Sequence, residues 1–404
     1  MAVEAVVAAL ATSLAVGDAL PAAEFRQVWL DTVFECFKLD PQFGDTATLA
    51  PWPLVMKADE WARLAQTAER LAAETLAAEL ELPHRPDLLR ELALPRQCRN
   101  AVREAARMGA PPAIARVMRF DFHPTAQGWQ VSEVNCDVPG GFIEASGFTA
   151  MMAARYPGLR PAGDPTAALA NALATAGPVG LVHATGYLDD RQVMHFLQRA
   201  LATRGTEALL LGPDEVAWRD GFASAGGVAL GAIFRFFPGE WLPNLGRRSG
   251  WQHYFRGSKT PQCNPATALA AQSKRLPLVW DRLAGSFETW KSVLPETRAA
   301  RGVAPDDVWV LKAALGRVGE EVGIRGVTPE KELRKIERWA RRRPKRWIAQ
   351  RRFEALALPV AGGSIYPCIG IYTVDGKACG AYGRAASRAL VDGNSRDVAV
   401  LLED

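Results

Sequence analysis

Residues 117–137, VMRFDFHPTAQGWQVSEVNCD, contain two apolar runs around a polar turn, with polar side chains at alternate positions of each run. This pattern predicts an antiparallel hairpin. In the register that the turn suggests, Asp121 lies opposite Glu133. Arg119 lies opposite Asn135, and all four side chains share one face because successive residues of a strand point to opposite faces. The chain must therefore build a sheet around a hairpin with one unusually polar face.

The polar face of the hairpin is a candidate metal site. Two carboxylates opposite each other lie about 5 Å apart and repel unless a positive charge lies between them. Asp121, Glu133 and Asn135 offer oxygen ligands only, without His or Cys, and such a set suits Mg²⁺ or Mn²⁺ held jointly by the protein and a phosphate. Arg119 would then face the same phosphate.

The same pattern has a simpler explanation. A solvated polar face is the default for an antiparallel sheet, with Phe120, Phe122 and Val134 packed underneath. The hairpin alone does not separate the two explanations, so the metal site needs support from elsewhere in the chain.

A second candidate site concerns phosphate. The chain has no GxxxxGK[ST] and no GxGxxG motif, so the common phosphate-binding fingerprints are absent. In VWVLKAALGRVGEEVGI, however, a predicted strand ends in Lys312 and leads into a loop with Gly316, Arg317 and Gly319. Backbone amides of such a loop can approach a phosphate closely, and the lysine adds a positive charge. Lys274 in AQSKRLPLVW gives a weaker signal of the same kind. A plain turn is the alternative for both.

The hydrophobic periodicity divides the chain into four parts and predicts an α/β (α+β) fold. Residues 1–112 repeat apolar residues every three or four positions, which predicts a helical region. Residues 113–175 hold the hairpin. Residues 176–260 alternate short apolar runs with a helix, as in a parallel α/β lobe. Residues 261–404 hold the glycine-rich loop and terminal strands separated by GG and DG turns.

Two helices are predicted in the last part. One is ATALAAQSKRLPLVWDRL. The other is the basic run RKIERWARRRPKRWIAQRR, which also invites a nucleic-acid interpretation. Ile336, Trp339 and Ala340 keep helical spacing there, which favours a solvated helix with one packed face.

Composition excludes some classes of protein. With 49% hydrophobic and 23% charged residues the chain reads as a soluble globular protein, and a net charge of +4 is too small to identify a nucleic-acid or membrane partner. The apolar stretch at residues 5–16 follows Glu4 and has no basic residue before Arg26, so no secretory signal is expected. No apolar run reaches the about 18 residues of a membrane span. The six cysteines lack C-x-x-C spacing, which predicts reduced thiols and a cytoplasmic location.

Six blocks follow one another along the chain: RFDF, SEVNCD, FRFFPGEWL, QSKRLPLVW, VLKAALGRVGEEVGI and GAYGRAASRALVDGNSRDV. In this order they resemble the synthetase domain of glutathionylspermidine synthase, a carboxylate–amine ligase of the ATP-grasp superfamily, over residues 115–404. The resemblance implies an ATP-grasp fold with an inserted Rossmann-like α/β lobe, preceded by the N-terminal helical region. It also implies that the metal ligands precede the phosphate-binding lysines in the chain.

The resemblance gives roles to the residues of the hairpin and of the last block. Asp121, Glu133 and Asn135 correspond to the magnesium ligands. Arg119 resembles an arginine of phosphoryl transfer, and Arg384 a further substrate or phosphate contact.

The resemblance also identifies the expected ATP contacts. Lys274 and Lys312 correspond to the lysines that hold the phosphates. Arg317 resembles the arginine of a mobile lid loop that contains Gly316 and Gly319. The implied cofactors are ATP and Mg²⁺, as two ions, with Mn²⁺ as the alternative.

Gln350 corresponds to a position near the adenine, and two departures from the family pattern stand out. Ala313 replaces the proline that usually follows the lysine. Residues 137–141 lack the hydroxyl side chains of glutathione-using members, which disfavours glutathione as the substrate.

The expected function is an ADP-forming acid–amine ligase that acts through an acyl phosphate, with a small carboxylic acid and an amine as substrates. A catalytically silent nucleotide-binding protein is the alternative, and a nucleic-acid binder is a weaker one. No nucleic-acid or membrane partner is expected, a homo-oligomer is left open, and the sequence does not identify the acid or the amine.

Overall fold

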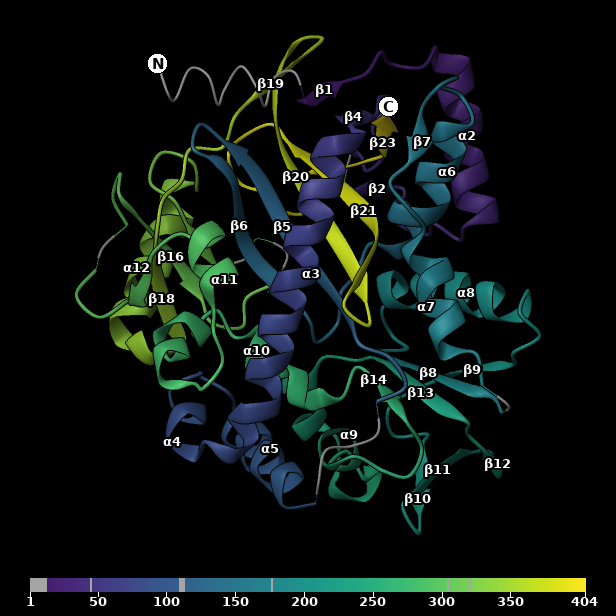
Figure 1. Cartoon of the computed structure of the whole chain (residues 1–404), viewed down its shortest axis with the longest axis vertical. Helices are drawn as coiled ribbons and strands as arrows, with labels where there is room; N and C mark the ends of the chain where they lie inside the picture. Colours follow the sequence, from purple (N-terminus) through teal and green to yellow (C-terminus); the bar gives the residue numbers. More distant parts are fainter. Residues whose placement is uncertain are drawn as a thin grey trace.

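The computed structural model describes residues 13–43, 46–108, 113–175, 177–303, 305–317, 319 and 321–404. Within these ranges the chain is the predicted mixed α/β protein, with several sheets that join distant parts of the sequence (Figure 1). Most of the apolar stretch at 5–16 lies outside the described residues. In the described part, none of the helices combines the length and apolar character needed to cross a bilayer. All six cysteines are free thiols, as predicted.

The largest sheet contains the predicted hairpin and the end of the chain. The hairpin strand β5 pairs antiparallel with β20, which comes from the C-terminal part, and Asp375–Gly376 form the predicted turn between β20 and β21. The order is β22-β21-β20-β5-β6, and β19 also pairs with β20. The strands are β5 (Val117–Thr125), β6 (Gly128–Asn135), β19 (Leu358–Val360), β20 (Gly363–Val374), β21 (Lys377–Ala386) and β22 (Arg396–Val398).

The predicted register of the hairpin is confirmed where it bears on the site. Arg119 pairs with Asn135 and Asp121 with Glu133. The turn pairs Thr125 with Gly128, and a bulge between Asp121 and the next residue shifts the register by one. A β-bulge of this kind inserts one extra residue and bends the strand.

The two faces of this sheet pack against different helices. Ile369 and Ile371 of β20 belong to the hydrophobic cluster that includes Leu71 of α3 (Ala58–Glu81), a helix predicted from the sequence. Tyr372 belongs to a second cluster with α7 (Pro165–Leu173). Because alternate residues of a strand point to opposite faces, the two helices cover opposite sides. Figure 1 shows α3 lying across the sheet.

The lobe predicted to be α/β is a parallel sheet. β8 (Val179–His183), β9 (Ala208–Leu211), β13 (Ala232–Phe236) and β14 (Gln262–Cys263) form it in the order β14-β13-β8-β9. The predicted helix is α8 (Leu188–Ala202), which connects β8 to β9. From β8 the chain thus continues to β9 at one edge of the sheet. It then returns to β13, beside β8, and adds β14 at the other edge.

The predicted strand after residue 308 lies in a third, antiparallel sheet. β16 (Trp309–Ala313) and β18 (Trp347–Arg351) are its central strands, flanked by β15 (Thr297–Ala299) and β17 (Val322–Gly323). The basic helix α12 (Glu330–Arg342) packs against it.

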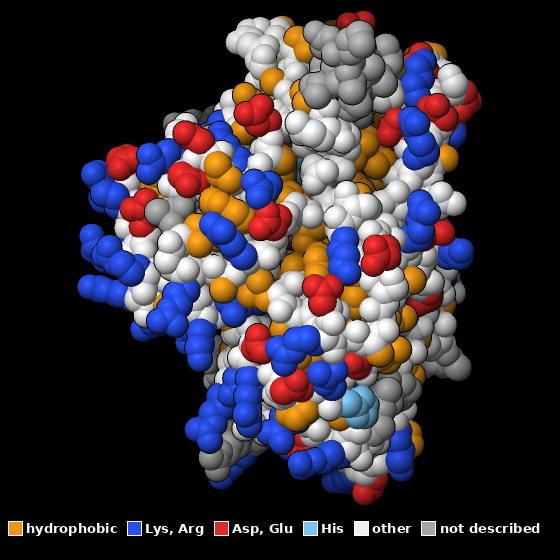
Figure 2. Space-filling model, turned by 60° about the vertical axis from the view of Figure 1, so that its left-hand side comes forward, with side chains coloured by type: hydrophobic (Ala, Val, Ile, Leu, Met, Phe, Trp, Pro, Cys, Tyr) orange, Lys and Arg blue, Asp and Glu red, His pale blue; other side chains and the backbone are white. Residues whose placement is uncertain are grey.

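The basic run is a helix only in its first part. α12 ends at Arg342 because Pro344 cannot continue a helix, and WIAQR forms β18 instead. Ile336 and Ala340 are buried as predicted, but Trp339 is 41% exposed. The packed face of the helix is therefore narrower than the predicted one, which included Trp339. On the face drawn in Figure 2, Lys and Arg side chains are interspersed with Asp and Glu, as on a solvated surface.

The continuous helix predicted for ATALAAQSKRLPLVWDRL is wrong. α10 (Leu269–Gln272) is a single turn, and the rest is a series of short 3₁₀ turns. Ser273 leaves the helical region with ψ 123° and donates its hydroxyl to the carbonyl of Leu92 at 2.6 Å, and Pro277 follows. The break turns the backbone amide of Lys274 to the carbonyl of Ala314, which lies 2.9 Å away at the end of β16.

A fourth sheet joins the two ends of the described chain, in the order β1-β4-β23-β7. The first 112 residues therefore contain strands as well as helices, and the domain boundaries at 112, 175 and 260 stay predictions. The strands of this sheet are β1 (Leu14–Val16), β4 (Leu54–Lys57), β7 (Arg160–Pro161) and β23 (Val400–Glu403). The remaining elements are α2 (Ala22–Glu35), β2 (Gln42–Phe43), β3 (Thr46–Ala47), α4 (Pro86–Leu89), α5 (Arg96–Met108), α6 (Thr149–Ala153), β10 (Ala217–Arg219), β11 (Phe222–Ala225), β12 (Val228–Ala229), α9 (His253–Arg256), α11 (Glu288–Val293) and short 3₁₀ and π turns.

Candidate active site

The polar face of the hairpin brings three predicted site residues together. Arg119 donates from Nε and Nη2 to the two carboxylate oxygens of Asp121, at 2.7 and 3.0 Å. Asn135 donates from Nδ2 to Oδ2 of the same carboxylate at 3.1 Å. Burial disfavours the charged guanidinium, but the Asp121 carboxylate outweighs burial and raises the pKa of Arg119. Asp121 is only 8% exposed, so this is not the solvated face of the simpler explanation.

Glycines hold this group in place from both sides. Gly140 accepts a hydrogen bond from Nη1 of Arg119 at 2.6 Å, and also one from the hydroxyl of Tyr372. A Cβ at Gly370 of β20 would lie 2.6 Å from Cδ of Arg119 and 2.9 Å from Oδ1 of Asp121. The pair therefore needs a glycine beside it on the neighbouring strand.

The second carboxylate of the hairpin has a different partner. Glu133 pairs with Nζ of Lys274 at 2.8 Å, and the same ammonium donates to the carbonyl of Gly316 at 2.7 Å. Burial would raise the pKa of Glu133, but the charges of Lys274, Lys312 and Arg119 outweigh it and lower the pKa to about 2. The broken helix around residue 273 thus delivers a cation to the hairpin carboxylate and to the glycine-rich loop.

Lys312 and Gln350 form a pair on adjacent strands. Lys312 of β16 donates from Nζ to Oε1 of Gln350 of β18 at 2.7 Å, and to the carbonyl of Ser132 at 3.4 Å. Gln350 in turn donates to the hydroxyl of Thr297 at 3.0 Å. Burial disfavours the ammonium and, although Glu133 acts in the opposite sense, lowers the pKa of Lys312 to about 8.

A pocket opens beside these lysines, between β6 and the short turns after α10. Its free space is about 390 Å³, solvent side included. Glu133, Lys274 and Gln350 lie at its polar end. The other lining residues are largely apolar: Ser132, Val134, Ala271, Gln272, Ser273, Leu276, Pro277, Trp280, Trp290 and Leu294.

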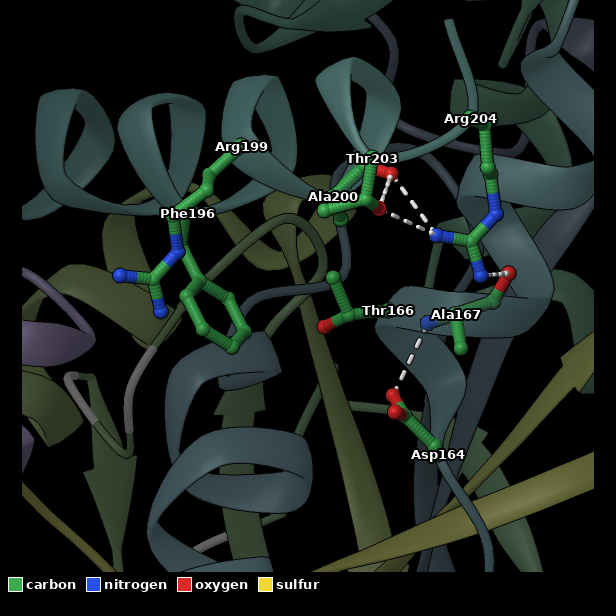
Figure 3. Close-up of a pocket in the computed structure, with 8 residues that line it drawn as sticks. All are labelled: Asp164, Thr166, Ala167, Phe196, Arg199, Ala200, Thr203 and Arg204. Atoms are coloured by element: carbon green, nitrogen blue, oxygen red, sulfur yellow. Dashed lines mark hydrogen bonds between the residues drawn. The ribbon is translucent and has the colours of Figure 1, made fainter.

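A second cavity, of about 510 Å³ with its solvent side, lies between α7 and α8 and contains none of the predicted site residues (Figure 3). Arg204 at its edge bonds Oδ1 of Asn171 and the carbonyls of Ala167 and Ala200, so its guanidinium is already occupied.

Arg317 of the glycine-rich loop lies apart from the other predicted residues. It binds Glu240 through Nε and Nη2, both at 3.0 Å, and Asp137 through Nη2 at 3.3 Å. Neither acid was predicted as a site residue. Glu240 stands in the block FRFFPGEWL and Asp137 in SEVNCD, so both were within the matched blocks. Only their spatial proximity to Arg317 gives them a role.

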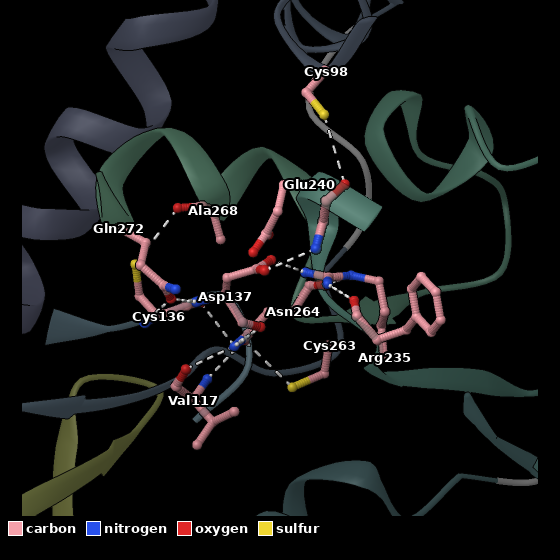
Figure 4. Close-up of polar contacts among 12 residues, drawn as sticks. Cys98, Val117, Cys136, Asp137, Arg235, Glu240, Cys263, Asn264, Ala268 and Gln272 are labelled. Atoms are coloured by element: carbon pink, nitrogen blue, oxygen red, sulfur yellow. Dashed lines mark hydrogen bonds and ion pairs between the residues drawn. The ribbon is translucent and has the colours of Figure 1, made fainter. Parts of the chain in front are cut away.

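Asp137 also belongs to a buried network that fixes the chain after β6 (Figure 4). Its carboxylate binds Nη2 of Arg235 at 2.5 Å and the amide of Gly239 at 2.9 Å, and neither charged side chain is exposed. Oε1 of Gln272 accepts the amide of Asp137 at 2.7 Å, and Nδ2 of Asn264 donates to the carbonyl of Cys136 at 3.0 Å. The segment that follows β6 is therefore held by groups of the α/β lobe and by Gln272 of α10.

Arg384 and Gly319 both contact the segment around residues 391–392, near the end of the chain. Nη2 of Arg384 donates to the carbonyl of Asp392 at 2.6 Å. Tyr382, two residues before Arg384 on β21, lies under the guanidinium of Arg119, whose Cζ is 5.1 Å from the centre of the tyrosine ring. Gly319 has φ +69°, and a Cβ there would lie 2.1 Å from the carbonyl of Val391. The glycine-rich loop thus contacts the last block of the chain.

The donor set of the hairpin fits a magnesium ion. Asp121, Glu133 and Asn135 supply two carboxylates and one amide, the hard oxygen ligands that Mg²⁺ prefers. As placed, Asn135 directs its nitrogen at Asp121, and coordination through its oxygen needs the amide turned over. In the described ranges no three His, Cys, Asp or Glu side chains are grouped for a metal. On the hairpin, the oxygen donor beside the two carboxylates is the amide of Asn135.

Comparison with known proteins places the fold. The family model for the glutathionylspermidine synthase preATP-grasp domain matches residues 53–403, which includes α3 and α5 as well as the region of the six blocks. A search of curated proteins gives no match. Among solved structures, a glutathione synthetase-like effector from Globodera pallida superposes with a TM-score of 0.61 at 15% identity, over 95% of this chain and 98% of that one.

A protein from Methylobacillus flagellatus KT, assigned as a gamma-glutamylcysteine synthetase, gives a TM-score of 0.43 at 13% identity, over 80% of this chain and 84% of that one. The family model covers most of the chain. The protein therefore belongs to the glutathionylspermidine synthase preATP-grasp family, and its α/β fold is that of the ATP-grasp-like synthetases.

Proposed function

We propose that this protein is an ATP-dependent ligase that joins a carboxylic acid to an amine and releases ADP and phosphate. The observation that carries the proposal is the arrangement of the hairpin. Asp121 and Glu133 lie opposite each other, each paired with a basic side chain, and Lys312 lies next to them on another sheet. Membership in a synthetase family supports the same reaction class.

The chemistry requires positioning and charge neutralisation more than a protein nucleophile. An oxygen of the substrate carboxylate attacks the γ-phosphorus of ATP, and ADP leaves with the electrons of the broken P–O bond. The amine nitrogen then attacks the acyl carbon, the C–O bond to phosphate breaks, and inorganic phosphate leaves with its electrons and takes up the proton that the nitrogen loses. Cys136 takes no part, because burial raises the pKa of its thiol and opposes the reactive thiolate.

The residues divide this work by their positions. Asp121, Glu133 and Asn135 would hold Mg²⁺, as two ions or with Mn²⁺ in its place, and the metal would neutralise charge on the phosphates. Arg119 stays with Asp121 beside them and faces the transferred phosphoryl group. Arg384 is a further contact for phosphate or acid.

The nucleotide would lie along the pocket beside β6. Lys274 lines its polar end and Lys312 donates to Gln350 there, and both lysines would bind the phosphates. Gln350 and the apolar lining residues would surround the adenine. Arg317, with Gly316 and Gly319 in its loop, would close over the reacting groups.

The acid substrate is proposed to differ from glutathione. Glutathione-using relatives carry hydroxyl groups after the Asn-x-Asp element, whereas in this chain Asp137 is followed by Val138, Pro139, Gly140 and Gly141. The carboxylate of Asp137 is already bound by Arg235 and by the amide of Gly239. The loop therefore offers a substrate peptide fewer free hydrogen-bond partners. The cytoplasmic location and the oligomeric state stay predictions.

ADP release measured over a panel of carboxylic acids and amines, with the mass of each product, tests the function. We expect ADP only with an acid and an amine together, in equal amount with an amide product. ATP binding without turnover on any pair would instead support the silent nucleotide-binding alternative.

Lys312 makes the nucleotide affinity depend on pH. Its pKa of about 8 lies below the usual 10.5, so the ammonium is present at pH 7 and is lost as the pH rises through 8. We expect the Kd for ATP to increase above pH 8, by at most about tenfold per pH unit, because one proton must be taken up. Lys312→Arg should give a flat profile, since guanidinium keeps its charge.

Calorimetric titrations with Mg²⁺ and ATP between pH 6.5 and 9.5 measure this effect. The same shift should make the free energy of unfolding rise between pH 8 and 10.5, because there the unfolded chain binds the proton that the folded chain has lost. A Kd that is constant over the whole range in the wild-type protein would contradict the assignment.

A further inference from the structure

The parallel sheet has a topological switch point next to the proposed active site. β8 and β13 are neighbours, but the chain leaves β8 towards β9 at one edge and leaves β13 towards β14 at the other. In open parallel sheets the loops at the carboxyl ends of such a strand pair diverge and leave a crevice that binds ligands. The loops concerned are residues 184–187 after β8 and residues 237–241 after β13.

Large apolar side chains are exposed on both loops and at the first residue of α8. Tyr187 and Leu188 are each 59% exposed and Trp241 is 36% exposed. The rings of Tyr187 and Trp241 lie 5.9 Å apart, and Trp241 also contacts Phe237 at 6.0 Å. We call Tyr187, Leu188 and Trp241 the apolar rim. Adjacent apolar side chains left in water over a crevice are a mark of a binding surface.

Carboxylates lie next to the apolar rim. Glu240 directly precedes Trp241 and binds Arg317. Asp190, three residues after Tyr187, belongs to the first turn of α8. Burial raises the pKa of Asp190 to about 6, and Asp189 adds to this effect while Arg317 opposes it. The crevice thus combines apolar rings with partly buried acids.

Arg317 links the loops of this crevice to the proposed reaction centre. Arg317 binds Glu240 on the crevice side and Asp137 on the hairpin side. Asp137 stands two residues after Asn135, a proposed metal ligand. Arg317 therefore connects the apolar-rim loops with the hairpin, and the lining of the nucleotide pocket beside β6 and Lys274 includes no residue of the apolar rim.

We propose that this crevice binds the amine substrate, and that this substrate is a primary amine with a hydrocarbon body. This rests on the proposed ligase function. Its ammonium would face Glu240 and Asp190, and its alkyl or aryl part would lie on Tyr187 and Trp241, since aromatic faces attract both hydrocarbon and organic cations. A polyamine would place a second charge on the apolar rim, and a small polar amine would leave the rim in water.

Calorimetry with defined amines tests the proposal. The probes are 2-phenylethylamine, hexylamine, ethanolamine and spermidine, each with and without Mg²⁺ and a non-hydrolysable ATP analogue. We expect the first two to bind at least about tenfold more tightly than ethanolamine, from the apolar area that they bury. Tyr187→Ala combined with Trp241→Ala should remove this preference. Tyr187→Ala alone, at a mostly exposed position, should weaken it.

Trp339→Ala is the matched control, because Trp339 is similarly exposed on α12 and contacts neither loop. It should leave all affinities unchanged. Equal binding of ethanolamine, tighter binding of spermidine, no amine binding in either condition, or an unaffected double variant would each overturn the proposal.

Lys312→Met separates this proposal from the ligase function. It should lose ADP release and keep the amine preference, because Lys312 lies on the nucleotide side. Amine binding without ADP release in the wild-type protein would refute the ligase and leave the crevice assigned. ADP release without the apolar preference would refute the crevice proposal and leave the ligase function supported.

Discussion

Glu133→Gln is expected to lower ADP release at least about a thousandfold while the protein stays folded, because a metal carboxylate contributes several kcal/mol to phosphoryl transfer. The substitution keeps the shape of the side chain but removes the charge that faces Asp121 across the hairpin. It also removes the partner of Lys274, which lies 2.8 Å away. Asn135→Ala should have an effect of the same kind through the third proposed ligand.

The measurement is ADP release with an acid and amine pair found in the screen, together with thermal unfolding of each variant. Glu403→Gln is the matched control, since Glu403 pairs with Lys57 on the surface with about half of each side chain exposed. Exposed pairs of this kind contribute about 0–1 kcal/mol. If Glu133→Gln and Asn135→Ala both keep full activity, the metal site does not exist as assigned.

Asp137→Ala is expected to lower the free energy of unfolding by about 3–5 kcal/mol, because it leaves the guanidinium of Arg235 buried without its counter-ion. Neither side chain of this pair is exposed. The carboxylate also accepts the amide of Gly239, which loses its partner, and a bond from Arg317, which keeps Glu240. The effect combines a charge penalty with lost hydrogen bonds.

Urea unfolding of the single variant, of Arg235→Met and of the double variant separates these terms. The double variant should be more stable than Asp137→Ala, because an apolar pair of similar volume replaces a buried ion pair at little cost. Glu296→Ala serves as the control at an exposed pair with Arg351, about half exposed on each side. A loss for Asp137→Ala no larger than for Glu296→Ala would contradict this account.

The hairpin shows what alternation in a sequence can predict. Alternation predicted that the polar side chains of the two strands share one face. A turn centred near Gln127 predicted the pairing of Asp121 with Glu133, and the structure confirms this pairing. In the structure the turn pairs Thr125 with Gly128, so an unbroken ladder would pair Asp121 with Ser132, and the bulge restores the predicted pairing. No glycine or other local signal marks that bulge, so the sequence could not predict it.

The partners of Arg317 show what the sequence could not predict. Asp137, Glu240 and Arg317 belong to three segments that lie far apart in the chain and meet only through the folded lobes. Local periodicity contains no information on such contacts. The same holds for β20 beside β5, which requires Gly370 next to Arg119.

The helix predicted around Lys274 failed for a different reason. Its apolar spacing is helical, but Ser273 bonds the carbonyl of Leu92 and Pro277 follows. Tertiary contacts here outweigh the local preference for a helix. The break turns Lys274 towards Glu133 and the glycine-rich loop.

The position of β23 affects how the chain is made. β23 lies between β4 and β7 in its sheet, and Val400, Leu401 and Leu402 are buried there. At about 5–20 residues per second, ribosomes need roughly 20–70 s to travel from β4 to β23. During that time one edge of β4 has no neighbouring strand, and an unpaired edge is a template for aggregation. Nascent chains of this protein therefore carry an open strand while the residues between β4 and β23 are made, and chaperones that shield such edges would raise its yield.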